Sequence, residues 1–211
     1  MESPFSGTSQ EEGLSRKIRI LRAAAKCIEE RGYRGTNIRE IAKESGIKGG
    51  SIYYHFSGKQ EILFEIMNHS MNDLITNVKE DIKAGSDAFD KLRRAMKFHI
   101  TYHIDNPYLT RVGDQELRSL SKQNYGVIVR KRREYEEIFV NILQEGVAEG
   151  SMQMESVRLI SIATLQLCNV HYWYKKDKHI NKFSPDELVN QYSNLLFEGI
   201  AAQGFSRKDR K

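Results

Sequence analysis

The chain of 211 residues is poor in proline, in cysteine and in long apolar runs. With only three prolines, long stretches are free to form uninterrupted helices, because proline breaks a helix interior. Its two cysteines, Cys27 and Cys168, fall inside apolar helical patterns, which is typical of buried thiols in a cytosolic protein rather than of a disulfide scaffold. No apolar run reaches the roughly 18 residues of a membrane span, and the N-terminus lacks the apolar core of a signal peptide. We therefore expect a cytoplasmic protein without a membrane partner.

The sequence also lacks any segment in which apolar and polar residues alternate with the period of a half-buried strand. Apolar residues recur instead at helical spacing, which predicts an all-α fold of about nine helices. We expect a flexible arm at 1–14, a helix-turn-helix domain with a linking fourth helix at 15–75, a larger helical domain at 76–204 and a basic tail at 205–211.

Positive charge is concentrated near the N-terminus. The chain has a net charge of +5 and a pI of about 9.1. Residues 1–60 hold eleven Lys and Arg against seven Asp and Glu, so +4 of that charge lies in this segment. Such a distribution permits binding to a polyanion such as DNA, without proving it.

Residues 37–56 predict two short helices joined by a glycine turn, the helix-turn-helix that places one helix in the DNA major groove. Asn37 and Glu40 have capping-box spacing at the start of the first helix, and Gly46 suits the positive φ of the turn. The second helix, about 49–56, is expected to bury its two apolar anchors and to present polar side chains to phosphates and base edges. The residues that it presents are Lys48, Gly49, Ser51, Tyr53, Tyr54 and His55.

Residues 15–75 resemble the DNA-binding domain of TetR-type transcriptional regulators. The matching positions are ILRAAAKCI at 20–28, Gly32-Tyr33, Thr36, Ile41-Ala42, Gly46-Ile47, the run 50–56, Lys59 and Leu63. The resemblance implies an N-terminal DNA-binding domain followed by a helical domain that binds an effector and dimerises. It also adds Thr36, Asn37, Gly50 and Lys59 to the expected DNA-binding residues.

Lys48 departs from the family pattern, which usually carries a capping Ser or Thr at this position. A lysine cannot accept the open N–H groups of a helix start. We therefore expect either that the second helix begins at Gly49 or that Lys48 contacts a phosphate.

Downstream of the motif, Ser57 and Gln60 have the spacing of a second capping box. The larger domain is expected to contain helices at about 87–105, 108–120, 123–148, 157–174 and 185–200. The segment 157–174 is apolar almost all round, so it should be covered on more than one side. Together with the last helix it is the best candidate for a homodimer surface; the alternative is that both helices close a monomer core.

Several segments of the larger domain resemble the fatty-acid-responsive, FadR-like branch of TetR regulators. They are Arg132-Arg133-x-Tyr135-Glu136, Glu145-Gly146-x3-Gly150, Asn169-x3-Trp173-Tyr174 and the run 183–188. Regulators of that branch bind acyl-CoA thioesters, which release them from DNA. Asn169 and Trp173 are expected one helical turn apart on one face, and Trp173 has core or dimer packing as its alternative role.

An acyl-CoA needs an apolar tunnel and cations for its phosphates. Helices rich in large apolar side chains could supply the first, and Arg118, Arg130, Arg133 and the loop KKDKHINK at 175–182 could supply the second. His99 and His103 have a metal-ligand spacing but no third ligand nearby, so we expect no metal and assign them to the core or to the pocket. The expected effector-binding residues are His99, Tyr102, His103, Arg118, Arg133, Asn169 and Trp173.

No catalytic constellation is legible, so we do not expect an enzyme, and we expect no cofactor apart from an effector. The favoured function is that of a homodimeric repressor of a palindromic double-stranded DNA operator. Binding of a small apolar effector, for which an acyl-CoA is the best candidate, would release the repressor from the DNA. One alternative is a repressor on the same scaffold that senses drugs or aromatic compounds, which carboxylates in the pocket would favour. The other is a non-regulatory helical protein with a helix-turn-helix-like segment.

Overall fold

The computed structural model describes residues 16–174, 177–179 and 181–197, and within these ranges the chain forms nine α-helices and no strand. The helices are α1 (Arg16–Gly35), α2 (Ile38–Ser45), α3 (Gly49–His55), α4 (Lys59–Asp81), α5 (Ala88–Asp105), α6 (Pro107–Gln115), α7 (Lys122–Ala148), α8 (Val157–Cys168) and α9 (Pro185–Phe197). Three short 3₁₀ turns lie at η1 (Ile82–Ala84), η2 (Leu117–Ser119) and η3 (Val170–Tyr172). The predicted all-α fold is confirmed, while the predicted arm at 1–14 and tail at 205–211 lie outside the described residues.

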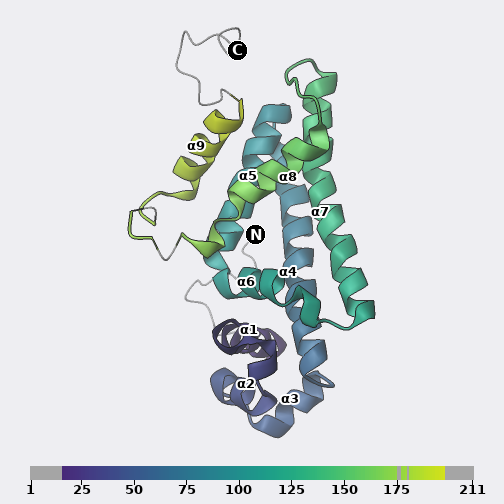
Figure 1. Cartoon of the computed structure of the whole chain (residues 1–211), viewed down its shortest axis with the longest axis vertical. Coiled ribbons are helices and arrows are strands. Elements are labelled where there is room, and N and C mark those ends of the chain that lie inside the picture. The colour runs from purple at the N-terminus through teal and green to yellow at the C-terminus, as the bar shows by residue number, and fades with distance from the viewer. Residues whose placement is uncertain (1–15, 175–176, 180, 198–211) are drawn as a thin grey trace, which may run out of the picture.

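Helices α1 to α3 form a small head at one end of the molecule, and α4 runs from this head into a larger bundle (Figure 1). The core of the head contains the apolar faces of α1, α2, α3 and the first half of α4. Four buried residues from beyond α4 complete it: Leu109, Val112, Leu120 and Ile128. The head is therefore not formed by the first four helices alone, because α6 and the start of α7 supply part of its core.

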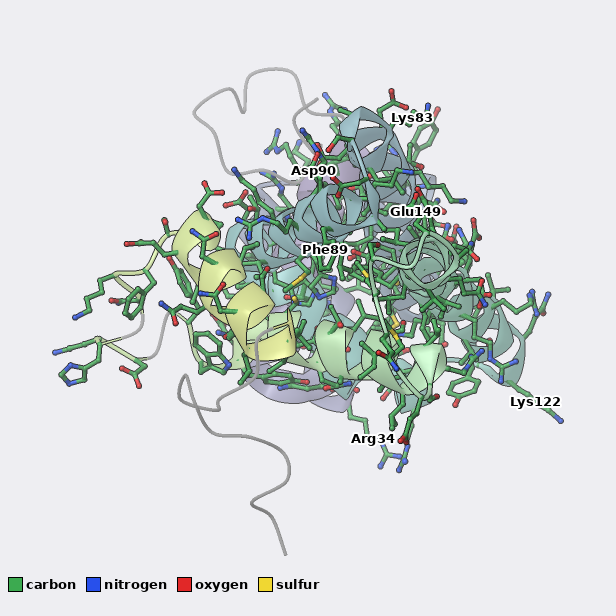
Figure 2. The ribbon with its side chains drawn as sticks, turned by 90° about the horizontal axis from the view of Figure 1, so that it is seen from above. Arg34, Lys83, Phe89, Asp90, Lys122 and Glu149 are labelled. Carbon is green, nitrogen blue, oxygen red and sulfur yellow. The ribbon has the colours of Figure 1, made fainter. Side chains whose placement is uncertain are left out.

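The second half of α4 packs with α5, α7, α8 and α9 around a separate core. Its fully buried members include Leu92, Met96 and Phe139, from α5 and α7. When the molecule is viewed down its long axis, α9 lies at the edge of this bundle (Figure 2). In the same view, the charged side chains of Lys122 and Arg34 point away from the ribbon. None of the described helices combines the length and the apolarity that crossing a bilayer requires.

Gly32 interrupts α1 three residues before its end. Its backbone, at φ 72° and ψ 160°, lies in a region open essentially only to glycine. The first helix was predicted to end at Gly32. The structure has a kink at this residue, and one more helical turn then leads to Gly35. A side chain at this position would meet Glu116, which comes from the larger domain.

Two predicted helix ends and one predicted capping pair were wrong. The helix expected over 157–174 stops at Cys168, and Asn169 (φ −73°, ψ 67°) turns the chain into η3, so Asn169 and Trp173 do not share a helix face. The helix expected over 108–120 stops at Gln115 and continues as η2. The partner of Ser57 is Glu61 and not Gln60, because both Ser57 N and Ser57 Oγ donate to Glu61 Oε2.

Candidate functional site

The first helix of the head motif, α2, is fixed at both ends by its own sequence. At its start, Glu40 N donates to Asn37 Oδ1 at 3.0 Å, and Asn37 N donates to Glu40 Oε2 at 3.0 Å. This pair is the predicted capping box, and it satisfies N–H groups that the first helical turn leaves open. At its end, Gly46 adopts φ 65°, which lets Ile47 N donate to Ala42 O. The turn therefore directs the chain into α3 with a defined geometry.

Helix α3 is anchored on one side and bare on the other. Ile52 and Phe56 are buried in the head core, whereas Tyr53 and Tyr54 are 61% and 88% exposed. The remaining exposed or half-exposed members of this surface are Lys48, Gly50, Ser51 and His55. We call the surface formed by Lys48, Gly50, Ser51, Tyr53, Tyr54 and His55 the reading face. Each exposed tyrosine offers an apolar ring and a polar hydroxyl, a combination enriched at interfaces, so this face is suited to contact another molecule.

Lys48 precedes α3, and its side chain makes no capping hydrogen bond to the helix. Helix α3 begins at Gly49, which is one of the two alternatives that the sequence predicts. The side chain of Lys48 is exposed. A positive charge beside the positive end of a helix dipole is unfavourable, and a nearby anion removes this conflict. Lys48 therefore remains available to a phosphate.

Thr36 and Lys59, which the sequence predicts as DNA contacts, make structural contacts inside the head. Thr36 is buried, and its hydroxyl donates to Cys27 O and to Gly32 O, both at 3.0 Å. Lys59 Nζ donates to Tyr33 O at 2.8 Å and to Thr36 O at 2.7 Å, and it lies 4.4 Å from the centre of the Tyr33 ring. These contacts use the polar groups of both side chains to hold the bend at Gly32.

Two cations that sequence reasoning did not single out lie on the surface of the head. Arg34 and Arg39 are exposed, and they flank the start of α2. Their position next to the capping box was the only signal in the sequence that could have marked them. Both add positive charge to the end of the molecule that carries the reading face.

A cavity of about 250 Å³ lies in the larger part of the molecule, among α4, α5, α6, α7 and α8. Its apolar lining is Met67, Met71, Leu74, Leu109, Ile128 and Leu165. Its polar lining is Ser70, His99, His103, Thr110, Asp114, Arg132, Tyr135, Glu136, Gln166 and Asn169, and Gly113 adds backbone. The two kinds of side chain make a small chamber that is apolar in part and rich in hydrogen-bonding groups.

His99 connects three helices at the inner wall of this cavity. Its Nδ1 lies 3.0 Å from Tyr135 Oη, and its Nε2 lies 3.1 Å from Asn169 Oδ1. Burial lowers the pKa of His99 to about 4, so the ring is neutral near pH 7. An amide oxygen only accepts, so Nε2 carries the proton and Tyr135 Oη donates to Nδ1.

A second histidine chain leads from the cavity toward α6. His103 Nδ1 lies 2.7 Å from His171 Nδ1, and His171 Nε2 lies 3.1 Å from Asp114 Oδ2. Burial lowers the pKa of His103 well below its ordinary value. Arg132 Nη2 and the hydroxyl of Tyr172 also contact the carboxylate of Asp114, and contacts from His171 and Arg132 lower its pKa even though burial opposes them. Asp114 is therefore ionised and fully partnered.

Comparison with known proteins agrees with this architecture over nearly the whole chain. Residues 20–66 match the bacterial regulatory proteins of the tetR family, and residues 85–200 match the tetracyclin repressor-like C-terminal domain. The chain belongs to the TetR family. As a TetR-family protein it is a DNA-binding transcriptional regulator, which excludes the alternative of a non-regulatory helical protein.

Several relatives in the TetR family are similar over most of their length. The transcriptional repressor KstR2 of Rhodococcus jostii is 24% identical, over 94% of this chain and 97% of its own. The structure of PfmR from Thermus thermophilus superposes with a TM-score of 0.79 at 29% identity, covering 87% of this chain and 100% of PfmR. The structure of FadR from Bacillus subtilis in complex with stearoyl-CoA has a TM-score of 0.72 at 29% identity, covering 87% and 99%.

The structure brings together only some of the predicted effector residues of this TetR-family chain. His99, His103 and Asn169 line the cavity, and Tyr102 lies behind it with its hydroxyl 3.0 Å from Ser70 Oγ. Three further predicted residues do not line this cavity: Arg118 and Arg133 are exposed, and Trp173 packs against the core of the larger domain.

Sequence reasoning missed Asp114, Arg132 and Tyr135 as cavity residues. Arg132 and Tyr135 stand in the quoted motif beside Arg133, one helical turn apart on α7, so the helical period was the signal that could have grouped them. Asp114 carried no comparable signal.

The two head residues Lys59 and Tyr54 should separate stability from DNA binding. Replacing Lys59 with alanine removes two partly buried hydrogen bonds and should lower the free energy of unfolding by about 2 kcal/mol. Tyr54→Ala removes a side chain that is 88% exposed, so stability should stay within about 0.5 kcal/mol while affinity for DNA falls. Urea unfolding followed by circular dichroism, with a DNA-binding titration, measures both. Equal stability of the two variants would contradict the structural role of Lys59.

The buried neutral histidines should make the protein sensitive to acid. Between about pH 6.5 and pH 4 the unfolded chain binds a proton at position 99 that the folded chain does not, so stability falls as the pH falls. From pH 7 to pH 5 the loss through His99 should be about 2 kcal/mol.

In His99→Gln this contribution disappears, and the free energy of unfolding should depend less steeply on pH. The matched control is His179→Gln, because His179 is exposed, and it should follow the wild-type curve. Parallel curves for all three proteins in urea titrations between pH 5 and pH 7 would refute the neutral buried state of His99.

Proposed function

We propose that this protein is a homodimeric TetR-family repressor whose reading face binds a palindromic operator and whose cavity binds an acyl thioester that releases the DNA. The observation that carries this proposal is a direct polar connection between the cavity and the head. Arg111, on α6, donates from Nε and Nη2 to His171 O at 3.2 and 3.0 Å, and from Nη1 to Glu29 Oε1 at 2.6 Å. Glu29 belongs to α1 of the head, and His171 contacts the cavity residues His103 and Asp114.

Two further contacts tie the same junction together. Tyr33 N, next to the bend at Gly32, donates to Glu116 Oε1 at 2.9 Å, and Gln60 Nε2 donates to Ser119 O at 2.7 Å. Because α6 and η2 provide these partners, a movement of α6 caused by a ligand changes how the head is held. A coupling of about 1–3 kcal/mol between the two sites changes operator affinity roughly 5–150-fold.

An acyl thioester agrees with the cavity lining and with the relatives. The apolar lining from α4, α6, α7 and α8 suits a hydrocarbon chain. FadR of Bacillus subtilis has been solved with stearoyl-CoA, and KstR2 is named a repressor. At the rim, Arg158 Nη2 lies 3.3 Å from Glu136 Oε1 with 61% of its side chain exposed, which leaves a cation near the opening for phosphates outside the cavity.

A sensor of cationic drugs is the second candidate function, because the cavity contains the carboxylates of Asp114 and Glu136. Each of these carboxylates already has an arginine within 3.3 Å, Arg132 for the first and Arg158 for the second. Since the carboxylates are neutralised in this way, a cation gains less here than in a pocket with free acids. The acyl thioester is therefore the preferred ligand.

Dimerisation is supported by large apolar side chains that are exposed to solvent on α8 and α9 of the single chain. Leu159 and Ile162 on α8 are 66% and 42% exposed, and Leu195 on α9 is 41% exposed. A helix-turn-helix reads one half-site, and two copies placed one DNA turn apart by a two-fold axis match a palindrome. A second copy of this chain covering α8 and α9 fits both requirements.

Charging this surface should abolish the dimer. The double variant Leu159→Glu, Ile162→Glu places two carboxylates in the proposed interface, so the protein should elute as a monomer in size-exclusion chromatography with light scattering. Its operator affinity should fall at least tenfold, because each head then binds alone. Val147→Glu is the control, since Val147 is similarly exposed on α7 and lies outside α8 and α9. A wild-type protein that is already monomeric on DNA would overturn the proposal.

The regulatory proposal is tested by DNA release. Purified protein should shift a duplex from the region upstream of its own gene, and acyl-CoA should reverse the shift at concentrations where free fatty acid and cationic dyes do not. Reversal by the dyes alone would favour the drug sensor. No shift of any duplex from this region at low salt would refute operator binding.

A further inference from the structure

One arginine of the cavity is suited to recognise the polar group that every acyl thioester carries, its carbonyl oxygen. We propose that Arg132 binds this oxygen and, in doing so, gives up its hydrogen bonds to α6. The inference rests on the proposed function and names the residue that links ligand binding to a movement of α6. Three features of Arg132 support it: its unused donors, its place in the cavity and the partners that it would leave.

The guanidinium of Arg132 uses only part of its hydrogen-bonding capacity. Its Nη2 donates to Gly113 O at 2.8 Å and to Asp114 Oδ1 at 3.1 Å. Its Nε is buried and has no hydrogen-bond partner among the described residues. A buried N–H group without an acceptor is unfavourable. The guanidinium therefore gains stability if it turns to a position in which a further oxygen accepts from it.

Arg132 lies where the lining of the cavity changes from apolar to polar. On α7 it is one helical turn from Ile128 of the apolar lining and one turn from Glu136 of the polar lining. Its side chain is 36% exposed, so it reaches from the cavity toward solvent. In an acyl-CoA the carbonyl stands at the same kind of boundary, between the hydrocarbon chain and the polar remainder of the molecule. A chain held by the apolar lining therefore brings its carbonyl to the level of Arg132.

Arg132 is also the strongest donor that the cavity offers to a carbonyl oxygen. Asn169 and Gln166 line the cavity too, but their amides are neutral. Hydrogen bonds from a charged donor are roughly twice as strong as those between neutral groups. The carbonyl oxygen is therefore expected to accept from the guanidinium rather than from either amide.

The present partners of Arg132 lie at the C-terminal end of α6, the helix that is joined to the head. The bonds to Gly113 and Asp114 are the hydrogen bonds that connect α6 to α7 among the described residues. If Arg132 turns to a ligand, Asp114 keeps His171 Nε2 at 3.1 Å and the hydroxyl of Tyr172 at 3.2 Å. The exchange therefore leaves no buried charge without a partner, and it frees α6 from α7.

The proposal is tested with two CoA derivatives that differ in one carbonyl group. In S-octyl-CoA a methylene replaces the carbonyl of octanoyl-CoA, while the chain length and the CoA part are the same. Each is titrated into the full-length protein in a calorimeter and added to its complex with operator DNA. We expect the wild-type protein to bind octanoyl-CoA at least tenfold more tightly, and only octanoyl-CoA to release the DNA at saturating concentration. Equal affinity for the two ligands, or release by both at saturation, would overturn the inference while leaving the proposed function intact.

Two variants locate the preference. Arg132→Met and Arg132→Gln remove the guanidinium, so the ratio of the two affinities should fall toward one. A purely structural role of Arg132 would weaken both ligands equally and leave the ratio as it is in the wild type. Arg133→Met is the matched control, because Arg133 is the next residue, is exposed and does not line the cavity. It should keep the wild-type ratio.

Circular dichroism and operator binding show whether each variant is folded, and the ratio of affinities is independent of the folded fraction. A preference for octanoyl-CoA that persists in Arg132→Met and Arg132→Gln overturns the assignment to Arg132. If neither ligand binds the wild-type protein and octanoyl-CoA does not release its DNA, the proposed function itself fails. That result is distinct from equal binding of the two ligands.

Discussion

The position of the head relative to the larger bundle depends on the hydrogen bonds of the Arg111 guanidinium to Glu29 and to His171 O. Its side chain is 11% exposed and that of Glu29 is 19% exposed, so the charge of each is compensated mainly by the other and by His171 O. A buried charge that loses its partner is strongly unfavourable. The head therefore cannot tilt away from α6 by a small gradual slide: either this set of bonds is intact or a different set has replaced it.

This constraint gives α6 its role. Leu109 and Val112 on one side of the helix belong to the core of the head, while Leu109 and Thr110 also line the cavity. The same nine-residue helix is thus part of both environments, and it carries Arg111 between them. Packed cores adopt alternative arrangements rather than deforming continuously, so a ligand that prefers another position of α6 favours another position of the head. The long helix α4 contributes buried residues to both cores, so it is a second element shared by the head and the larger bundle.

The sequence predicted the head well because the signals there are local. The capping box at Asn37, the positive φ at Gly46 and the buried pair on α3 each depend on residues within one or two helical turns. The structural contacts of Thr36 and Lys59 were not predicted, because their partners, the carbonyls around the bend at Gly32, are defined by three-dimensional structure and not by spacing.

The cavity was predicted less well for a related reason. Choosing Arg132 over Arg133 requires the rotation of a 27-residue helix relative to its neighbours, and an error of one residue turns a side chain by about 100°. The end of α8 was missed because no glycine or proline marks it. Asn169 leaves the helix and bonds to His99, 70 positions earlier in the chain, and such a long-range partner cannot be inferred from the apolar pattern of 157–174.

The histidines determine what kind of recognition the cavity permits. Neutral rings at His99 and His103 add no charge, and Asp114 and Glu136 each have an arginine beside them. The inner wall therefore acts through directed hydrogen bonds and through shape, while the open charges lie at the rim. A ligand with an uncharged body and an anionic tail would place each part in matching surroundings, because the body would replace water in the chamber and the tail would remain near Arg158. Hydrogen bonding also explains how buried polar groups persist beside an apolar lining, because His99 provides a partner for one polar atom of Tyr135 and one of Asn169.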